Sequence, residues 1–471
     1  MVFSSGTFLF FFLPIVLVLY FINKNLRWRN TVLMIASVFF YAWGEPLFLF
    51  VMLSMVFLNW LLARSISKVK SKKAKKALVT ISISVDILVF FLFKYLNFFL
   101  QNVGLLFNKE WGTEIALPIG ISFFTFQIMS YVLDVYWEKA KVQKNPLDLL
   151  LYISMFPQLI AGPIVRYETI ANELTCRPIK AKDITIGVQR FVIGLAKKTL
   201  IANYVAMIAD NIFANVDYGL ATTTAWLGAF AYAFQIYFDF SGYSDMAIGL
   251  GRIFGFHFDE NFNYPYVADS VTNFWRRWHI SLSTWFRDYV YIPLGGNRVS
   301  KLKWIRNLLA VWLLTGIWHG ANWTFIAWGL YYFVFLLLEK NIKFRFKKFK
   351  FINHLYTIVV VLIGWVLFRS DDIAHAWKYI VAMFGGSSNF IDNEFLYYLK
   401  GGAFVLICAT VFSLPVLEQI RKFVDRMTKN GSKIIPVVSD VLGSIIIISL
   451  FAISVITNVA SSYNPFIYFN F

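Results

Sequence analysis

Residues 304–319, Trp304-Ile-Arg-Asn-Leu-Leu-Ala-Val-Trp-Leu-Leu-Thr-Gly-Ile-Trp-His319, form a run apolar enough to cross a bilayer, and the run ends in a histidine. An ionisable side chain in such a setting is costly and is by default a candidate functional group. An imidazole takes up and returns protons near neutral pH. His319 therefore indicates chemistry carried out inside a membrane.

The rest of the chain has the composition of a membrane protein. Of its 471 residues, 59% are hydrophobic and 15% are charged, against roughly 25% charged in soluble domains. Mean hydropathy is +0.62. We expect an all-α polytopic membrane protein, one domain over 1–471, with roughly eleven to thirteen transmembrane helices of about 17 to 25 residues. The apolar runs lie at 7–23, 30–44, 46–64, 78–98, 115–136, 186–212, 222–250, 304–318, 322–340, 351–369, 403–419 and 440–458.

Positive charge is distributed unevenly between the loops. Most of the 44 Lys and Arg residues fall in seven loops, whereas the opposite loops hold only Lys109, Lys378 and Lys400. Because cytoplasmic loops are enriched in Lys and Arg, this asymmetry predicts extracytoplasmic N- and C-termini in a bacterial cytoplasmic membrane. The net charge of +18 is then mainly a topology signal, since no basic soluble domain is present that would indicate nucleic-acid binding. The basic loops lie at 24–30, 64–77, 137–150, 163–185, 296–306, 340–350 and 421–433.

Two segments are unsuited to spanning the membrane. Residues 147–165 are apolar but are interrupted by Pro157, Gly162 and Pro163. A broken helix at membrane depth needs protein or a cavity to satisfy its backbone, so we expect a re-entrant or interfacial element there. Arginines crowd the segment 253–303, which should therefore lie on the membrane, or dip into it, from the cytoplasmic face.

The segment 253–303 contains a second histidine in a basic, aromatic setting. We expect this histidine and the serine four residues later on one helix, flanked by tryptophans of interface-seeking character. The two arginines offer planar forks suited to phosphate, so they predict a binding site for a large anionic donor at a cytoplasmic mouth. The alternative is a helix bound to anionic lipid headgroups. The residues concerned are Trp275, Arg276, Arg277, Trp278, His279 and Ser283.

The distribution of positive charge between the loops places His319 near the outer half of the 304–318 span, at the helix end or in the turn that follows. Gly316 and Gly320, four residues apart, allow a neighbouring helix to approach closely. A neutral imidazole at this position can act as general base toward a hydroxyl nucleophile and then as acid toward a leaving thiolate. The alternative is a packing histidine bonded to a backbone carbonyl.

We expect the carboxylates inside the apolar segments to have structural roles. Asp239 and Asp245 lie in an apolar stretch, where carboxylates need partners. They are roughly 120° apart around a helix, so we expect pairing with Arg or backbone amides rather than a catalytic dyad.

Cys176 and Cys408 are far apart and lack His or Cys neighbours at ligand spacing. The sequence therefore indicates neither a disulfide framework nor a metal site.

The chain ends in the aromatic, uncharged stretch Tyr463-Asn-Pro465-Phe-Ile-Tyr468-Phe-Asn-Phe471. One interpretation of this tail, residues 459–471, is an aromatic belt at the membrane interface. The other is a segment that folds back into the outer cavity and presents the Tyr468 hydroxyl to His319. A phenol can accept an acyl group because its ester remains a good donor for the next transfer.

Taken in order along the whole chain, these motifs resemble the alginate and peptidoglycan O-acetyltransferase branch of the bacterial membrane-bound O-acyltransferase (MBOAT) superfamily, to which the teichoic-acid D-alanyl transferase is related. The motifs are Met1-Val-Phe-Ser-Ser5, Leu117-Pro-Ile-Gly-Ile-Ser-Phe-Phe-Thr-Phe126, Phe156-Pro-Gln-Leu-Ile-Ala-Gly-Pro163, Tyr237-Phe-Asp-Phe-Ser-Gly-Tyr-Ser-Asp245, Phe274-Trp-Arg-Arg-Trp-His-Ile-Ser-Leu-Ser283, Leu294-Gly-Gly-Asn-Arg298 and Trp318-His-Gly-Ala-Asn-Trp323.

The resemblance implies a ring of helices around a thinned centre, with a tunnel that joins the cytoplasm to the outside. It implies that His319 is the catalytic histidine and His279 the second signature residue, with Trp318 and Asn322 at the donor site or tunnel. No bound cofactor is implied. Acetyl-CoA is the implied donor, and an SGNH/GDSL-like extracytoplasmic partner would esterify a polysaccharide. In the related D-alanylation systems a separate peptide carries an acceptor tyrosine, and Tyr468 is similar to it.

Two other functions stay open from the sequence. One is D-alanyl transfer to teichoic acid. The other is a membrane transporter that moves an acylated lipid or a thioester without bond chemistry, which broken helices and intramembrane carboxylates would also fit. The sequence shows no inverted repeat, which disfavours the transporter.

Overall fold

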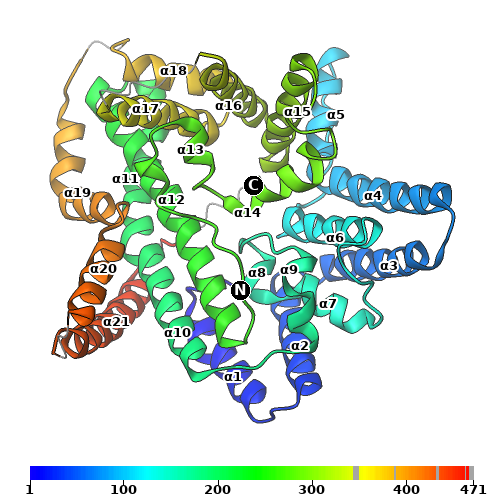
Figure 1. The fold of residues 1–471 in the computed structure, drawn as a ribbon. Helices are drawn as coiled ribbons and strands as arrows, with labels where there is room; N and C mark the ends of the chain where they lie inside the picture. Colours follow the sequence, from blue (N-terminus) through cyan, green and yellow to red (C-terminus); the bar gives the residue numbers. More distant parts are fainter. Residues whose placement is uncertain (343–349, 387–388, 431–433, 462, 466–471) are drawn as a thin grey trace.

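The computed structural model describes residues 1–342, 350–386, 389–430, 434–461 and 463–465, and in these ranges every regular element is a helix. This confirms the predicted all-α class. In the view of Figure 1, the long helices surround a middle region that contains the short helices α8 (Phe156–Leu159) and α14 (Ile280–Phe286).

The helices of the first half begin at recognisable caps. The side chain of Asn25 accepts a hydrogen bond from the backbone N–H of Arg27 at the start of α2, and Asn145 does the same for α7, whose first residue is Pro146. A π-helical turn, Lys197–Ala202, joins α10 to α11 in one continuous helix. The bounds are α1 Leu13–Phe21, α2 Leu26–Gly44, α3 Phe48–Lys68, α4 Lys72–Lys94, α5 Leu96–Leu106, α6 Ile121–Tyr136, α7 Pro146–Ser154, α9 Tyr167–Thr175, α10 Ala181–Ala196 and α11 Asn203–Ala214.

The second half is organised around α12, a helix of 32 residues that is buried along nearly its whole length. Asp372 and Asp392 cap α18 and α19 through bonds from the backbone N–H groups of His375 and Phe395. The bounds are α12 Thr222–Ile253, α13 Val271–Trp275, α15 Lys301–His319, α16 Trp323–Ile342, α17 Lys350–Arg369, α18 Ile373–Met383, α19 Asn393–Phe412, α20 Val416–Lys429 and α21 Ile434–Ala460.

Six described helices are long and apolar enough to cross a membrane, so the protein is a multi-pass membrane protein. This number is smaller than the predicted eleven to thirteen. Helices such as α12, α15 and α16 coincide with predicted spans, but they contain Trp, Tyr, Gly or charged residues that lower their mean hydropathy. The six spans are Phe48–Lys68, Lys72–Lys94, Ala181–Ala214, Lys350–Arg369, Asn393–Phe412 and Ile434–Ala460.

The segment 147–165 is the broken element that its prolines predict. Helices α7 and α8 are separated at Met155, and the surrounding protein satisfies the freed backbone groups. The backbone N–H of Phe156 donates to Ser37 Oγ at 3.1 Å, and that of Ile164 donates to Ser281 Oγ at 3.0 Å. The burial of this segment agrees with the requirement that irregular backbone in a membrane protein be covered by protein.

The interior contains two clusters of buried apolar side chains. The first is formed mainly by α1–α4 and α6–α9, together with α14. The second is formed mainly by α11–α13 and α15–α18. Trp318 belongs to the first cluster, whereas Trp328 and Phe368 belong to the second. The end of α15 therefore lies where the two clusters meet.

Candidate active site

The end of α15 is held close to α16, as the two glycines predict. A methyl group at Gly316 would collide with the carbonyl oxygen of Phe325, and one at Gly320 would collide with the ring of the same residue. Small residues at these positions let the two helices meet backbone to backbone. The contact fixes His319, the last residue of α15, in the interior.

His319 is only 6% exposed and is surrounded by aromatic rings. Its imidazole centroid lies 5.1 Å from the ring of Trp318, 5.1 Å from Trp328 and 5.0 Å from Phe368. Its Nδ1 has no hydrogen-bond partner among the described residues. The packing alternative would have placed this ring against a carbonyl. An unbonded ring nitrogen is instead what a proton-transfer group needs before its substrate arrives.

His279 lies outside a helix, contrary to the expectation that it shares one with Ser283. Its backbone has φ +44°, and α14 begins at the next residue. The turn arises because the N–H of Ile280 bonds to the Asn261 carbonyl at 3.0 Å. Ser283 is exposed, and its hydroxyl reaches the Trp275 carbonyl at 3.4 Å. His279 instead precedes the first turn of α14, where its carbonyl accepts a hydrogen bond from the Ser283 N–H at 3.1 Å.

Asn261 and Ser281 are the residues that orient His279, and the sequence analysis missed both. His279 Nδ1 lies 3.1 Å from Asn261 Oδ1 and 3.4 Å from Ser281 Oγ. Asn261 is itself held, since its Nδ2 donates to Ser244 Oγ at 3.1 Å. This network fixes the ring and leaves Nε2, which has no partner in the part of the chain that the structure describes.

The two histidines lie beside the same indole. The Trp318 ring centroid is 6.0 Å from that of His279 and 5.1 Å from that of His319. Both imidazoles therefore pack against Trp318, and each has one ring nitrogen without a hydrogen bond. The expected catalytic role of His319, and that of His279 beside it, stays a prediction.

The tryptophans of the 253–303 segment do not face a membrane interface. Trp275 is 8% exposed and Trp278 is 3% exposed. Trp275 packs edge-on against Trp312 at 4.9 Å, and Trp278 lies 4.7 Å from Trp365. Helices α15–α17 cover this side of α13. The tryptophans that the sequence pattern assigns to a membrane interface are therefore buried against these helices.

The two arginines have different surroundings. Arg277 donates to Asn273 Oδ1 at 2.9 Å and to the Asn263 carbonyl at 3.0 Å, so its guanidinium braces the local chain. Arg276 is exposed. Of the two arginines predicted to bind phosphate, Arg276 is the one whose guanidinium can reach an anion in solution.

Asn322 holds the start of α16. Its Nδ2 donates to the Asp371 carbonyl at 2.7 Å, and its Oδ1 accepts from the N–H of Thr324 at 3.1 Å. These bonds fix the turn that follows His319 to the loop after α17. The expected place of Asn322 at the donor site or tunnel stays a prediction.

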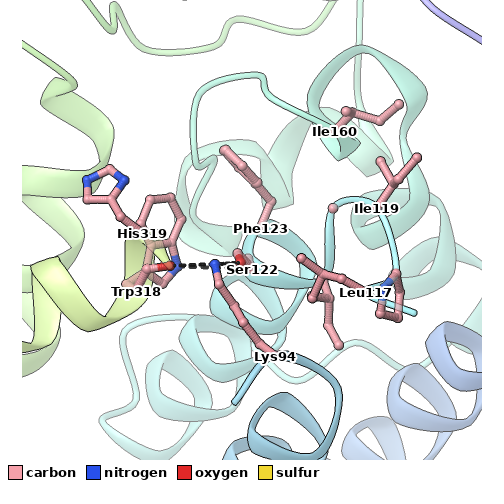
Figure 2. Close-up of a pocket in the computed structure, with 11 residues that line it drawn as sticks. Lys94, Leu117, Ile119, Ser122, Phe123, Ile160, Trp318 and His319 are labelled. Carbon is pink, nitrogen blue, oxygen red and sulfur yellow. Dashed lines mark hydrogen bonds between the residues drawn. The ribbon is translucent and has the colours of Figure 1, made fainter. Parts of the chain in front are cut away.

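A pocket of about 60 Å³ opens beside His319, several times the roughly 10–15 Å³ that one water molecule needs. Figure 2 shows Lys94 reaching this pocket from the end of α4. Lys94 is not among the predicted site residues, although a lysine inside the apolar run 78–98 is a signal for function. The lining residues are Lys94, Leu117, Pro118, Ile119, Gly120, Ile121, Ser122, Phe123, Ile160, Trp318 and His319.

The carboxylates on α12 are paired, as predicted. Asp245 lies 2.9 Å from Arg190 and 2.7 Å from Lys197. Asp239 pairs with a lysine rather than an arginine, since Lys198 Nζ is 2.7 Å away. Both members of the Lys198–Asp239 pair are almost fully buried, at 3% and 2% side-chain exposure.

This buried pair also contacts the C-terminal tail. Lys198 Nζ donates to the Pro465 carbonyl, and Asn464 bonds to Asn203 at 3.3 Å. The Tyr463 hydroxyl donates to the Asp210 carboxylate. Burial and this neighbouring carboxylate raise the pKa of Tyr463 above its usual range, so the phenol stays protonated as the donor.

Tyr468 lies outside the described residues, so its place relative to His319 stays a prediction. The described part of the tail nevertheless reaches the interior of the protein, because Pro465 contacts a buried ion pair on α12 and the π-helical turn. An exposed aromatic belt does not account for that contact.

Comparisons with known proteins identify the family. A model of the MBOAT, membrane-bound O-acyltransferase family matches residues 35–368. The chain is 38% identical to the probable alginate O-acetylase of Pseudomonas putida over 100% of both proteins. It is 36% identical to the peptidoglycan O-acetyltransferase of Helicobacter pylori, covering 82% of this chain and 80% of that protein. It is 32% identical to the teichoic acid D-alanyltransferase of Bacillus subtilis, covering 55% of this chain and 70% of that protein.

The matched range contains both histidines, Trp318 and Lys94. The family is one of enzymes that make and break ester bonds, which answers the question left open between an enzyme and a transporter. The chain is an O-acyltransferase and belongs to the MBOAT, membrane-bound O-acyltransferase family.

Proposed function

We propose that this O-acyltransferase moves an acetyl group from cytosolic acetyl-CoA across the cytoplasmic membrane, for O-acetylation of a cell-envelope or exported polysaccharide. The observation that carries the proposal is His319, a buried imidazole with an unbonded Nδ1 at the edge of a pocket. The names of the relatives from Pseudomonas putida and Helicobacter pylori support acetyl as the group and an alginate-like polymer or peptidoglycan as the final acceptor.

The proposed route begins at the cytoplasmic face and ends outside. Acetyl-CoA enters on the side of the basic loops, and its acyl carbon reaches the pocket beside His319. The group leaves on the extracytoplasmic side to a secreted partner of the SGNH type, which esterifies the polysaccharide. Only the small acyl group crosses, so the nucleotide of the donor stays in the cytoplasm.

The proposed chemistry is two successive transfers. His319 removes the proton from the Tyr468 hydroxyl as that oxygen attacks the thioester carbonyl carbon, and the carbon–sulfur bond then breaks. The leaving thiolate takes the proton back from His319. Acetyl-Tyr468 passes its group to a serine of the partner. Holding both reactants in one site can contribute on the order of 7 kcal/mol through proximity.

The anchored part of the tail supports this role for Tyr468. Pro465 is bound to Lys198, which is fixed by Asp239. Position 468 is three residues beyond Pro465 in the sequence. We propose that the Lys198–Asp239 pair thereby determines where the acceptor is held.

Replacing the pair by Lys198→Met with Asp239→Asn should lower acetyl transfer by up to roughly 10²-fold, because a small misplacement of a reacting group is costly. The double change avoids leaving one buried charge unpaired. The measurement is covalent label on the purified protein from radiolabelled acetyl-CoA. The control is Lys197→Met with Asp245→Asn, a neighbouring pair that makes no hydrogen bond to the described tail residues 463–465. Equal losses in both double variants would contradict a specific role in tail placement.

Arg276→Ala should raise the KM for acetyl-CoA roughly tenfold, corresponding to about 1.4 kcal/mol, with kcat unchanged. The reason is that the exposed guanidinium is proposed to bind the phosphates of the donor before the chemical step. Arg287→Ala is the control, since that arginine is also exposed but pairs with Asp288. A fall in kcat without a change in KM would remove Arg276 from the donor site.

A second candidate is D-alanyl transfer to teichoic acid, which the Bacillus subtilis relative favours. The purified protein, offered radiolabelled acetyl-CoA or a D-alanyl carrier thioester in separate reactions, should become labelled with acetyl alone. Labelling by the D-alanyl donor and not by acetyl-CoA would overturn the acetyl assignment.

A further inference from the structure

Lys94 is a buried cation that no carboxylate neutralises within the described ranges. Lys94 is the last residue of α4, which is one of the apolar candidate spans, and it is 8% exposed. Two of its three N–H donors are used: Nζ donates to Ser122 Oγ at 3.0 Å and to the Trp318 carbonyl at 2.7 Å. Burying an ammonium group in this way is costly, and cations kept inside membrane proteins usually serve a function.

The surroundings of Lys94 connect it to the reaction. Lys94 and His319 line the same pocket, as Figure 2 shows, and Lys94 holds the carbonyl of the residue that precedes His319. The pocket combines an imidazole that has an unbonded nitrogen with an amine that can donate hydrogen bonds. An acyl transfer needs both, because a proton leaves the nucleophile while negative charge develops on the carbonyl oxygen.

Capping the end of α15 does not by itself explain Lys94. The neighbouring Tyr95 already caps that helix end, since its hydroxyl donates to the Ile317 carbonyl at 2.5 Å. Tyr95 does not line the pocket. The two adjacent residues therefore share one structural task, and of the two only Lys94 lines the pocket together with His319.

We propose that Lys94 is a catalytic residue whose third N–H donates to the carbonyl oxygen of the acyl thioester, and this inference rests on the proposed function. As the acceptor hydroxyl oxygen bonds to the carbonyl carbon, its proton goes to His319 and the carbonyl electron pair moves onto oxygen. Lys94 stabilises that oxyanion. The electron pair then returns, the carbon–sulfur bond breaks, and the thiolate leaves with the proton from His319.

The test compares Lys94→Met with Tyr95→Phe in the full-length purified protein, using acetyl-CoA and measuring thiol release. Loss of an oxyanion donor should lower kcat by roughly 10²–10³-fold with KM nearly unchanged. Tyr95→Phe, which removes the neighbouring helix cap, should stay within a few-fold of wild type. Lys94→Arg keeps the cation and should recover part of the lost kcat.

Three outcomes would overturn this assignment. Equal losses of kcat in Lys94→Met and Tyr95→Phe would reduce Lys94 to a helix cap. A raised KM with wild-type kcat would make it a donor-binding group. Failure of the wild-type protein to release thiol would defeat the proposed function itself, and this inference with it. Should Lys94→Met not insert into membranes, Lys94→Gln carries the same comparison, because its two N–H groups can serve Ser122 and the Trp318 carbonyl and leave no third donor for the oxyanion.

Discussion

His319→Ala should abolish acetyl transfer, with a loss of roughly 10²–10⁴-fold, while the protein still inserts and folds. The reason is that the variant keeps the aromatic pocket but has no group to accept the proton of the attacking hydroxyl. The measurement is radiolabel transferred from acetyl-CoA to the purified chain, alongside the thermal midpoint of unfolding in detergent.

The chain offers two matched controls for this experiment. His354 Nδ1 lies 3.0 Å from the Ala268 carbonyl, and His375 Nε2 lies 3.1 Å from the Phe213 carbonyl. Both are histidines that bond to backbone, as the packing alternative would require of His319. Alanine at either position should leave transfer close to wild type. Near-wild-type transfer by His319→Ala would remove this residue from the mechanism.

Tyr468→Phe has the second-largest expected effect, because it removes one oxygen atom and with it the proposed covalent acceptor. We expect no stable acetyl label on the chain and loss of transfer to the partner, with thiol release from acetyl-CoA also suppressed. Mass spectrometry of the C-terminal peptide after reaction with acetyl-CoA measures the label directly.

Tyr463→Phe serves as the control within the same tail. It removes the hydrogen bond to Asp210 but leaves the proposed acceptor in place, so the acetyl label should persist. Partner acetylation that survives Tyr468→Phe would mean that the partner is acylated directly from the thioester, without a tyrosine relay.

The sequence was most informative where a residue type is rare in its setting. A histidine at the end of an apolar run predicted His319 as a site residue, and the structure places it beside a pocket. Carboxylates inside α12 predicted partners that the structure supplies. Prolines in the segment 147–165 predicted a broken helix for the same reason. Each of these features violates the ordinary composition of a membrane helix, and that makes it visible without coordinates.

The predictions that did not hold concern contacts between parts of the chain that are distant in sequence. Trp275 and Trp278 have the pattern of interface residues, but helices distant in sequence bury them. The turn at His279 depends on a bond to Asn261, eighteen residues earlier, which no local pattern reveals. Lys94 was missed because an average over a long apolar run hides a single charge.

The π-helical turn Lys197–Ala202 has a consequence for how this chain tolerates change in length. Its extra residue lets adjacent lysines serve two different carboxylates, with Lys197 on Asp245 and Lys198 on Asp239. A π-helical turn absorbs one inserted residue locally, so the helices on either side keep their faces. Deleting Lys197 or Lys198 should therefore leave α10 and α11 in register, and the main loss would be the contact of that lysine with its carboxylate.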